Sequence, residues 1–106
     1  MYYPYLRGRQ FELIALRNFS ETINGESKVF PIIEPVRKNF NSLKRAATAM
    51  TEKGIKYGII LNPEFGDYKD QMISLAEEEG FPSVECWAPS YIIGRQNISF
   101  IQKLTL

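Results

Sequence analysis

The sequence predicts an α/β domain of four strand–helix units, with a parallel sheet in the strand order 1-2-3-4. Two observations support this fold class. The runs 29–36 and 55–61 are apolar on both alternating faces, a pattern typical of strands buried on both sides. Stretches with apolar residues at helical spacing separate these runs, as in 9–23. Strands that alternate with helices form parallel sheets with right-handed crossovers.

The first half of the chain supplies two of these units. Residues 2–6 form a short aromatic strand near a sheet edge, since Pro4 has no backbone donor. Gly8 turns the chain into the helix 9–23, which Asn24-Gly25 ends. The strand 29–36 and a second helix follow, and Gly54 stops that helix. Asn41 is a plausible N-cap for it, and its apolar stripe comprises Leu43, Ala46, Ala47 and Met50.

The second half is expected to continue the pattern. After the strand 55–61, Asp67 caps a third helix that ends at Gly80, with Met72, Leu75 and Ala76 facing inward. Residues 90–93 are the favoured fourth strand, and 83–87 could pair along an edge. A short helix is expected near 98–104.

With 106 residues the chain has room for a single domain. Four consecutive units resemble half of a (βα)8 TIM barrel, which needs roughly 250 residues to close. Two interpretations are open: an open four-stranded sheet, or the N-terminal half of a longer barrel protein. The sequence ends at 102–106 without a polar tail, which favours the longer protein.

Composition excludes several function classes. The sequence has no histidine and one cysteine, so histidine-based nucleophilic catalysis and the usual zinc sites cannot be built from it. We expect no metal and no cofactor, because no dense acidic cluster sits at a strand end and glycine-rich nucleotide loops are missing. A net charge of +1 gives no reason to expect nucleic acid or an anionic membrane as a partner. The single cysteine favours a reducing, cytoplasmic setting, and no apolar run is long enough to span a bilayer.

Glu34 is the main candidate for a site, because a charge in an apolar strand needs a partner. Ligands of parallel α/β folds bind at the carboxyl ends of the strands. Those ends should present Glu34 with the polar residues that follow the other strands: Arg7, Arg9, Arg37, Asn62, Glu64 and Arg95. Arginines beside a glutamate could bind a carboxylate or phosphate, with Glu34 as catalytic acid or base. A purely structural ion pair between Glu34 and Arg7 or Arg9 is the alternative.

Other polar and aromatic residues have simpler interpretations. Asn62 before Pro63 is a turn residue or a ligand contact. Glu12 should be exposed on its helix. Tyr2, Tyr3 and Tyr5 are expected to be packing residues.

The opening pattern resembles a known family. It runs Tyr3-x-Tyr5-Leu6-Arg7-Gly8-Arg9-Gln10-x-Glu12-x-x-Ala15-Leu16, and Pro31-Ile32-Ile33-Glu34 and Leu61-Asn62-Pro63 follow. This pattern is similar to the start of the phage and bacterial "beta protein" family and covers about the first third of a typical member. The resemblance implies a TIM-barrel-like fold of unestablished activity, found in prophages and near presumed defence genes. Members often have lysine after the first strand, where this chain has Arg7 and Arg9.

Two functions from different classes are therefore open. One is a scaffold or interaction protein that keeps the barrel-like fold without catalysis. The other is a barrel enzyme acting on a small anionic or phosphorylated substrate, with an arginine clamp and Glu34 as acid or base. We also expect a homodimer, because four such strands leave a bare apolar sheet face. Candidates to line that face are Tyr5, Ile33, Ile60 and Ile92.

Overall fold

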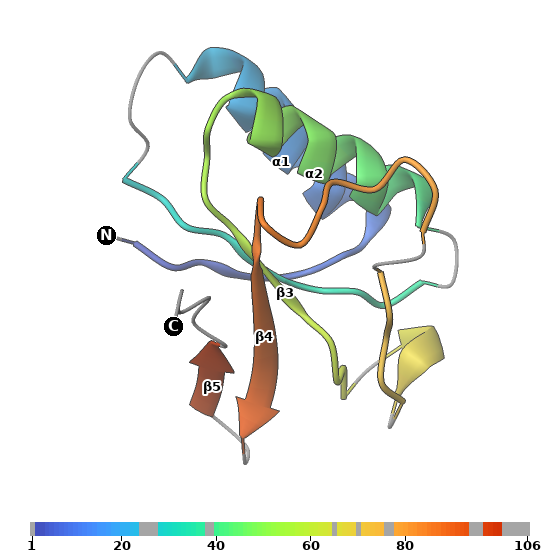
Figure 1. Ribbon diagram of the computed structural model, residues 1–106. Helices are drawn as coiled ribbons and strands as arrows, with labels where there is room; N and C mark the ends of the chain where they lie inside the picture. The colour runs from blue at the N-terminus through green and yellow to red at the C-terminus, as the bar shows by residue number, and fades with distance from the viewer. Residues whose placement is uncertain are drawn as a thin grey trace.

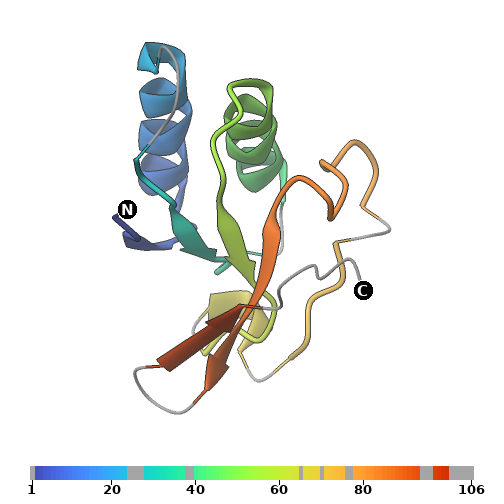
Figure 2. The same ribbon diagram turned by 60° about the vertical axis from the view of Figure 1, so that its left-hand side comes forward.

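The computed structural model describes residues 2–23, 28–37, 40–64, 66–69, 71–75 and 78–93, and the backbone of 97–100. Four parallel strands pair in the order of the sequence: β1 (Tyr5–Arg7), β2 (Ile32–Glu34), β3 (Gly58–Ile60) and β4 (Ala88–Ile93). The predicted α/β class and strand order 1-2-3-4 are thereby confirmed. The helices α1 (Gln10–Thr22) and α2 (Asn41–Glu52) lie side by side on one face of the sheet (Figures 1 and 2).

Both helices form where the apolar periodicity predicts them. α1 buries Leu13, Leu16 and Ser20, and α2 buries a stripe at i, i+3, i+4 and i+7, consisting of Leu43, Ala46, Ala47 and Met50. These side chains pack with Ile33 and Ile59 of the sheet into one core. Phe40, rather than Asn41, is the N-cap of α2. The expected helix end at Asn24-Gly25 lies outside the described residues.

The strands are shorter than the apolar runs that predict them. β2 covers only Ile32–Glu34 of the run 29–36, because Pro31 and Pro35 on either side have no backbone donor. Before β1 and β2, the chain adds a single parallel bridge between Tyr2 and Val29. Three residues in each of β1, β2 and β3 are enough to fix the register, and the register decides which side chains share a face.

The register corrects the expected composition of the second sheet face. Leu6, Ile33 and Ile59 are aligned and point toward the helices, so Ile33 does not line that face. Ile60 is fully buried rather than bare. Tyr5 is 42% exposed and Ile92 is half-buried. The expected lining of a bare apolar face is therefore wrong at Ile33 and Ile60, and the homodimer itself stays a prediction.

The third helix expected at 67–80 is not formed in the described residues. A single 3-10 turn, η1 (Gly66–Tyr68), is followed by non-helical chain at 71–75. The backbone N–H of Ile73 donates to the carbonyl of Leu61, 2.8 Å away, which draws this segment along the end of β3. Ile73 and Leu75 are buried, whereas Met72, expected to face inward, is 65% exposed. Burial in this segment alternates with a period of two, as in an extended strand. Ala76, also expected to face inward, lies outside the described residues.

The end of the described chain also differs from the expectation. β4 starts at Ala88, earlier than the predicted 90–93, and residues 83–87 form turns instead of an edge strand. Where a helix was expected near 98–104, β5 (Asn97–Phe100) pairs antiparallel with β4. Residues 101–104 lie outside the described part. In the described part of the chain, no helix has the length and apolar character needed to cross a membrane.

Candidate functional site

Glu34 lies at the carboxyl end of β2, where the sheet register brings the strand ends together. Its Cα is aligned with that of Arg7 on β1, so the two side chains leave the sheet on the same face. Tyr5 is two residues before Arg7 and shares that face. The helices pack on the opposite face, against Ile33 and Ile59. The site is therefore built on the side of the sheet that the two helices leave uncovered.

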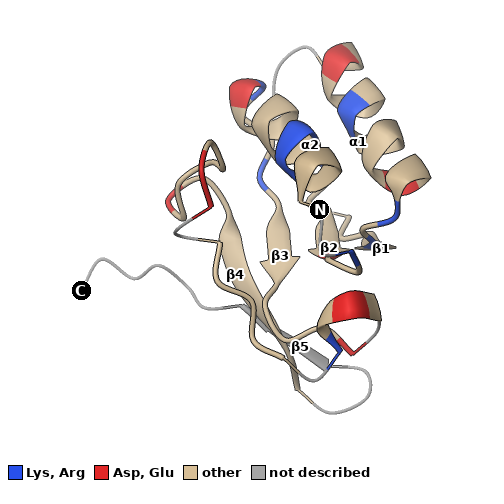
Figure 3. Ribbon diagram, turned by 90° about the vertical axis from the view of Figure 1, so that its right-hand side faces the viewer, with Lys and Arg blue, Asp and Glu red and all other residues tan. Residues whose placement is uncertain are grey.

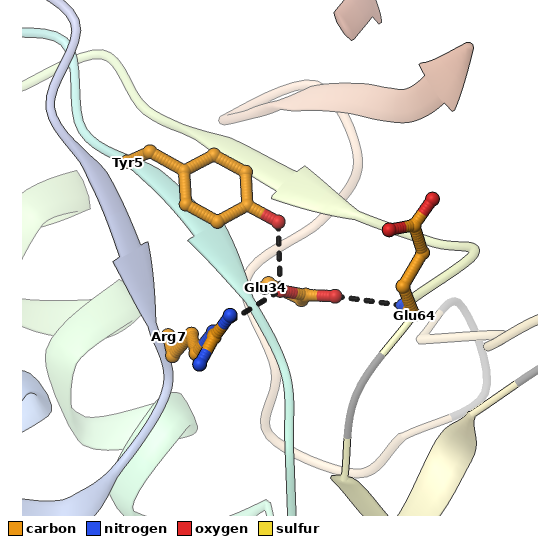
Figure 4. Close-up of polar contacts among 4 residues, drawn as sticks. All are labelled: Tyr5, Arg7, Glu34 and Glu64. Atoms are coloured by element: carbon orange, nitrogen blue, oxygen red, sulfur yellow. Dashed lines mark hydrogen bonds and ion pairs between the residues drawn. The ribbon is translucent and has the colours of Figure 1, made fainter. Parts of the chain in front are cut away.

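Both carboxylate oxygens of Glu34 accept short hydrogen bonds, although the residue is completely buried. The Tyr5 hydroxyl donates to Oε1 at 2.7 Å, and the backbone N–H of Glu64 donates to Oε2 at 2.7 Å (Figure 4). Nε of Arg7 is 4.0 Å from Oε1, and the Arg7 side chain is 40% exposed. The predicted burial of Glu34 near Arg7 is thus confirmed. The two short bonds, rather than the long ion pair, satisfy the buried charge.

The tyrosine hydroxyl is held in its neutral form. Partial burial raises the pKa of Tyr5 well above its usual value, and the hydrogen bond to the Glu34 carboxylate raises it further. A phenolate next to Glu34 would place two negative charges 2.7 Å apart. Tyr5 therefore serves as a hydrogen-bond donor to Glu34 at any pH near neutrality.

The loop after β3, residues 64–67, contacts the end of β2 at three adjacent positions. Besides the bond from the Glu64 N–H to Glu34, the N–H of Asp67 donates to the carbonyl of Val36 at 3.0 Å. Gly66 has φ +84° and packs so closely that an added Cβ would lie 2.6 Å from Cα and Cβ of Val36. These contacts make Glu34 the point where β1, β2 and this loop meet.

Arg9 and Arg37 follow the ends of β1 and β2, and both are exposed. Neither forms an ion pair with Glu34, so Arg7 is the arginine that the structure brings to the carboxylate. Both helices that begin at this edge lack a side-chain cap, at Arg9 for α1 and at Phe40 for α2. Arg95 lies outside the described residues.

The side chain of Asn62 pairs with the backbone of Ile92 on β4, a role that its position before a proline does not indicate. Its side-chain oxygen accepts from the N–H of Ile92 at 2.9 Å, and its amide group donates to the carbonyl of Ile92 at 3.1 Å. The side chain thereby continues the β3–β4 pairing beyond Ile60. Of the two interpretations from the sequence, the structure favours the structural one.

Two expectations about single residues are wrong. Glu12 is half-buried on α1, and its Oε2 is buried without a hydrogen-bond partner among the described residues. The packing role expected of the N-terminal tyrosines is wrong for Tyr2, which is 67% exposed. Tyr3 and Tyr5 are 51% and 42% exposed, but the ring of Tyr3 lies 5.2 Å from that of Phe30.

Two donors of the site were missed: the Tyr5 hydroxyl and the backbone N–H of Glu64. The alternation of side chains along a strand places Tyr5 on the same face as Arg7, so this signal was present in the sequence. The Glu64 N–H carries no sequence signal, because every residue except proline has this donor.

The described residues contain no group of three or more cysteine, aspartate or glutamate side chains that could hold a metal ion. Comparison of the chain with protein-family models, with curated proteins and with solved structures gives no match. The site therefore has to be interpreted from its own geometry.

Proposed function

We propose that this chain is a non-catalytic scaffold or interaction domain of the cytoplasm, which presents the carboxyl edge of its sheet to a small anionic group. The observation that carries the proposal is the complete burial of Glu34, with a short hydrogen bond to each carboxylate oxygen. Both of its oxygens are bound by donors of the same chain, so the carboxylate joins β1, β2 and the loop after β3. An acid or base for catalysis would need an oxygen within reach of a substrate proton.

The anionic group is inferred from the exposed part of the same edge. Arg9 and Arg37 extend from neighbouring strand ends, and two helices begin there without side-chain caps. Arginine forms bidentate bonds with carboxylates and phosphates, and helix N-termini add oriented N–H groups. The exposed carboxylates of Glu64 and Asp67 lie on the nearby loop and oppose an anion. We therefore expect weak binding, in the millimolar range.

The resemblance to the "beta protein" family supports the same proposal. It implies a barrel-like protein without an established activity, associated with prophages and defence genes. Half of a TIM barrel would have the parallel order seen in β1 to β4, with anion-binding groups at the carboxyl ends of the strands. In the proposal, the chain contributes this binding edge to a phage-related assembly.

Titration with inorganic phosphate, followed by amide chemical shifts, tests the proposal. We expect shifts confined to residues 7–10, 34–37 and 62–67, and weaker binding in the variant Arg9→Ala/Arg37→Ala. Glu34→Gln should retain phosphate binding wherever it remains folded, since Glu34 holds the edge together and does not contact the anion. Shifts spread evenly over the surface would contradict the proposal.

A barrel enzyme that acts on a small phosphorylated substrate is the second candidate. The observation in its favour is the proximity of Arg7, which is 40% exposed, to the buried carboxylate of Glu34. An arginine that holds the substrate beside a carboxylate is a combination suited to acid–base catalysis. Hydrolysis of p-nitrophenyl phosphate by the wild type, abolished in a folded Glu34→Gln variant, would favour this candidate over the scaffold.

A further inference from the structure

The outer surface of the helix pair carries a groove that plays no part in the site at the sheet edge. The groove has a volume of about 360 Å³ and lies between α1 and α2. Small side chains, Ser20 and Ala49, are among the residues that line it. Its charged residues are Arg17, Glu21, Lys44, Arg45, Glu52 and Lys53. Within the described part of the chain, none of these six forms an ion pair with another residue.

The charges of the groove are separated along the helix axes. α1 and α2 run in the same direction, because each connects successive strands of a parallel sheet. Arg17 precedes Glu21 by one turn on α1, and Arg45 precedes Glu52 by two turns on α2. Figure 3 shows acidic segments near the ends of both helices and basic segments nearer the middle. One half of the groove thus holds three cations, and the other holds two carboxylates and one cation.

This arrangement is complementary to itself under a two-fold rotation. A two-fold axis perpendicular to the helices would place the basic half of one groove against the acidic half of another. The two helix pairs would then run antiparallel, and small residues such as Ser20 and Ala49 would allow close approach. A groove with one sign of charge would repel its own copy. We propose that this groove is a homodimer interface, in which Arg17 and Arg45 of one copy face Glu21 and Glu52 of the second.

The proposed interface differs in place from the dimer that the sequence suggested. That dimer needed a bare apolar sheet face, but Ile33 packs under the helices and Ile60 is fully buried. The groove lies on the outer surface of the helices, whereas Glu34 and its partners lie on the opposite side of the sheet. Dimerisation through the groove is therefore independent of the proposed anion binding, and each can fail without the other.

Charge reversal in matched pairs tests the interface. Arg17→Glu/Arg45→Glu makes the groove largely acidic, and Glu21→Lys/Glu52→Lys makes it basic throughout. In sedimentation velocity from low to high micromolar concentration, we expect the wild type to dimerise and the affinity to fall at least tenfold from low salt to about 0.5 M NaCl. Each reversed variant should be a monomer alone. An equimolar mixture of the two should form a heterodimer, because each basic half again meets an acidic one.

Several results would overturn the proposal. The first is a wild type that stays monomeric at high micromolar concentration. The second is a charge-reversed variant that dimerises as the wild type does. The third is an equimolar mixture of the two variants that does not associate. Circular dichroism checks that the variants are folded. If a double variant is not folded, Arg45→Glu and Glu52→Lys alone carry the same test, because both side chains are exposed. Phosphate shifts at residues 7–10 and 34–37 should be unchanged in the monomeric variants.

Discussion

The hydroxyl of Tyr5 donates a hydrogen bond of 2.7 Å to Oε1 of Glu34, joining the edge strand β1 to a buried carboxylate on β2. On the other oxygen, the N–H of Glu64 donates at the same distance from the loop after β3. A buried charge is tolerated only when its hydrogen-bonding capacity is satisfied. The local order of this sheet edge thus depends on Glu34. We expect substitutions of Glu34 to lower the stability of the chain.

Replacing Glu34 by alanine should lower the free energy of unfolding by about 2–4 kcal/mol, because the Tyr5 hydroxyl and the Glu64 N–H lose their acceptor. Arg7, which is 40% exposed, can turn to solvent and adds little to this loss. Urea unfolding measures the change. The matched control is Glu64→Ala, since Glu64 contributes its backbone N–H and its side chain is exposed. The control should stay within about 0.5 kcal/mol of the wild type. Equal losses in the two variants would contradict the role of Glu34.

Gly66→Ala should detach the loop after β3 from β2. Its Cβ would lie 2.6 Å from Val36 Cα and Cβ, and the backbone would keep a positive φ. Gly54 is a matched control, because it also has a positive φ but an added Cβ meets nothing within 4 Å. We expect Gly54→Ala to cost about 1 kcal/mol, from the backbone alone, and Gly66→Ala about 2 kcal/mol more. Amide exchange at Asp67 should accelerate in Gly66→Ala only.

The segment 71–75 can be tested by neighbouring substitutions. Ile73 is buried and Met72 is 65% exposed, so Ile73→Ala should cost about 2–4 kcal/mol and Met72→Ala less than about 0.5 kcal/mol. An amphipathic helix with Met72 facing inward would give the opposite order. Thermal or urea unfolding of the two variants distinguishes the two structures.

Stability should fall above about pH 10 because of Tyr57, and the raised pKa of Tyr5 adds to the same loss. Burial raises the pKa of Tyr57 to about 12, and its hydroxyl pairs with Thr51 Oγ1 at 2.9 Å. Between pH 10 and 12 the unfolded chain loses the phenolic proton while the folded chain keeps it, so a rise in pH favours unfolding. Tyr57→Phe should reduce this slope. Urea unfolding at several pH values between 8 and 12 measures the slope.

The sequence was sufficient to predict the parts of the fold governed by local periodicity. Leu13 and Leu16 of α1 and the stripe from Leu43 to Met50 of α2 follow the helical period, and the alternation of elements implies the parallel order. The prediction of a third helix was wrong because this segment fits two patterns. Met72, Leu75 and Ala76 have a helical spacing, whereas Ile73 and Leu75 have the spacing of a strand. The hydrogen bond from Ile73 to Leu61, a contact between distant residues, decides between them.

The candidate site was predictable only in part. The lone charge in an apolar strand identified Glu34, and the strand ends identified Arg7 as its neighbour. The partner of Asn62 could not be predicted, because the Ile92 backbone lies on a strand whose register the sequence does not specify. The loop contact through the Glu64 N–H depends on the close packing of Gly66 against Val36, and such packing is decided by the folded chain as a whole.

A double-mutant cycle on Tyr5 and Glu34 tests the central claim most directly. The free energies of unfolding of the wild type, Tyr5→Phe, Glu34→Ala and the double variant give the coupling between the two side chains. We predict that the double variant is less destabilised than the sum of the single variants by about 1–2 kcal/mol, because either change alone breaks the same hydrogen bond. Single effects that add to within about 0.3 kcal/mol would contradict the claim that this bond holds the sheet edge together.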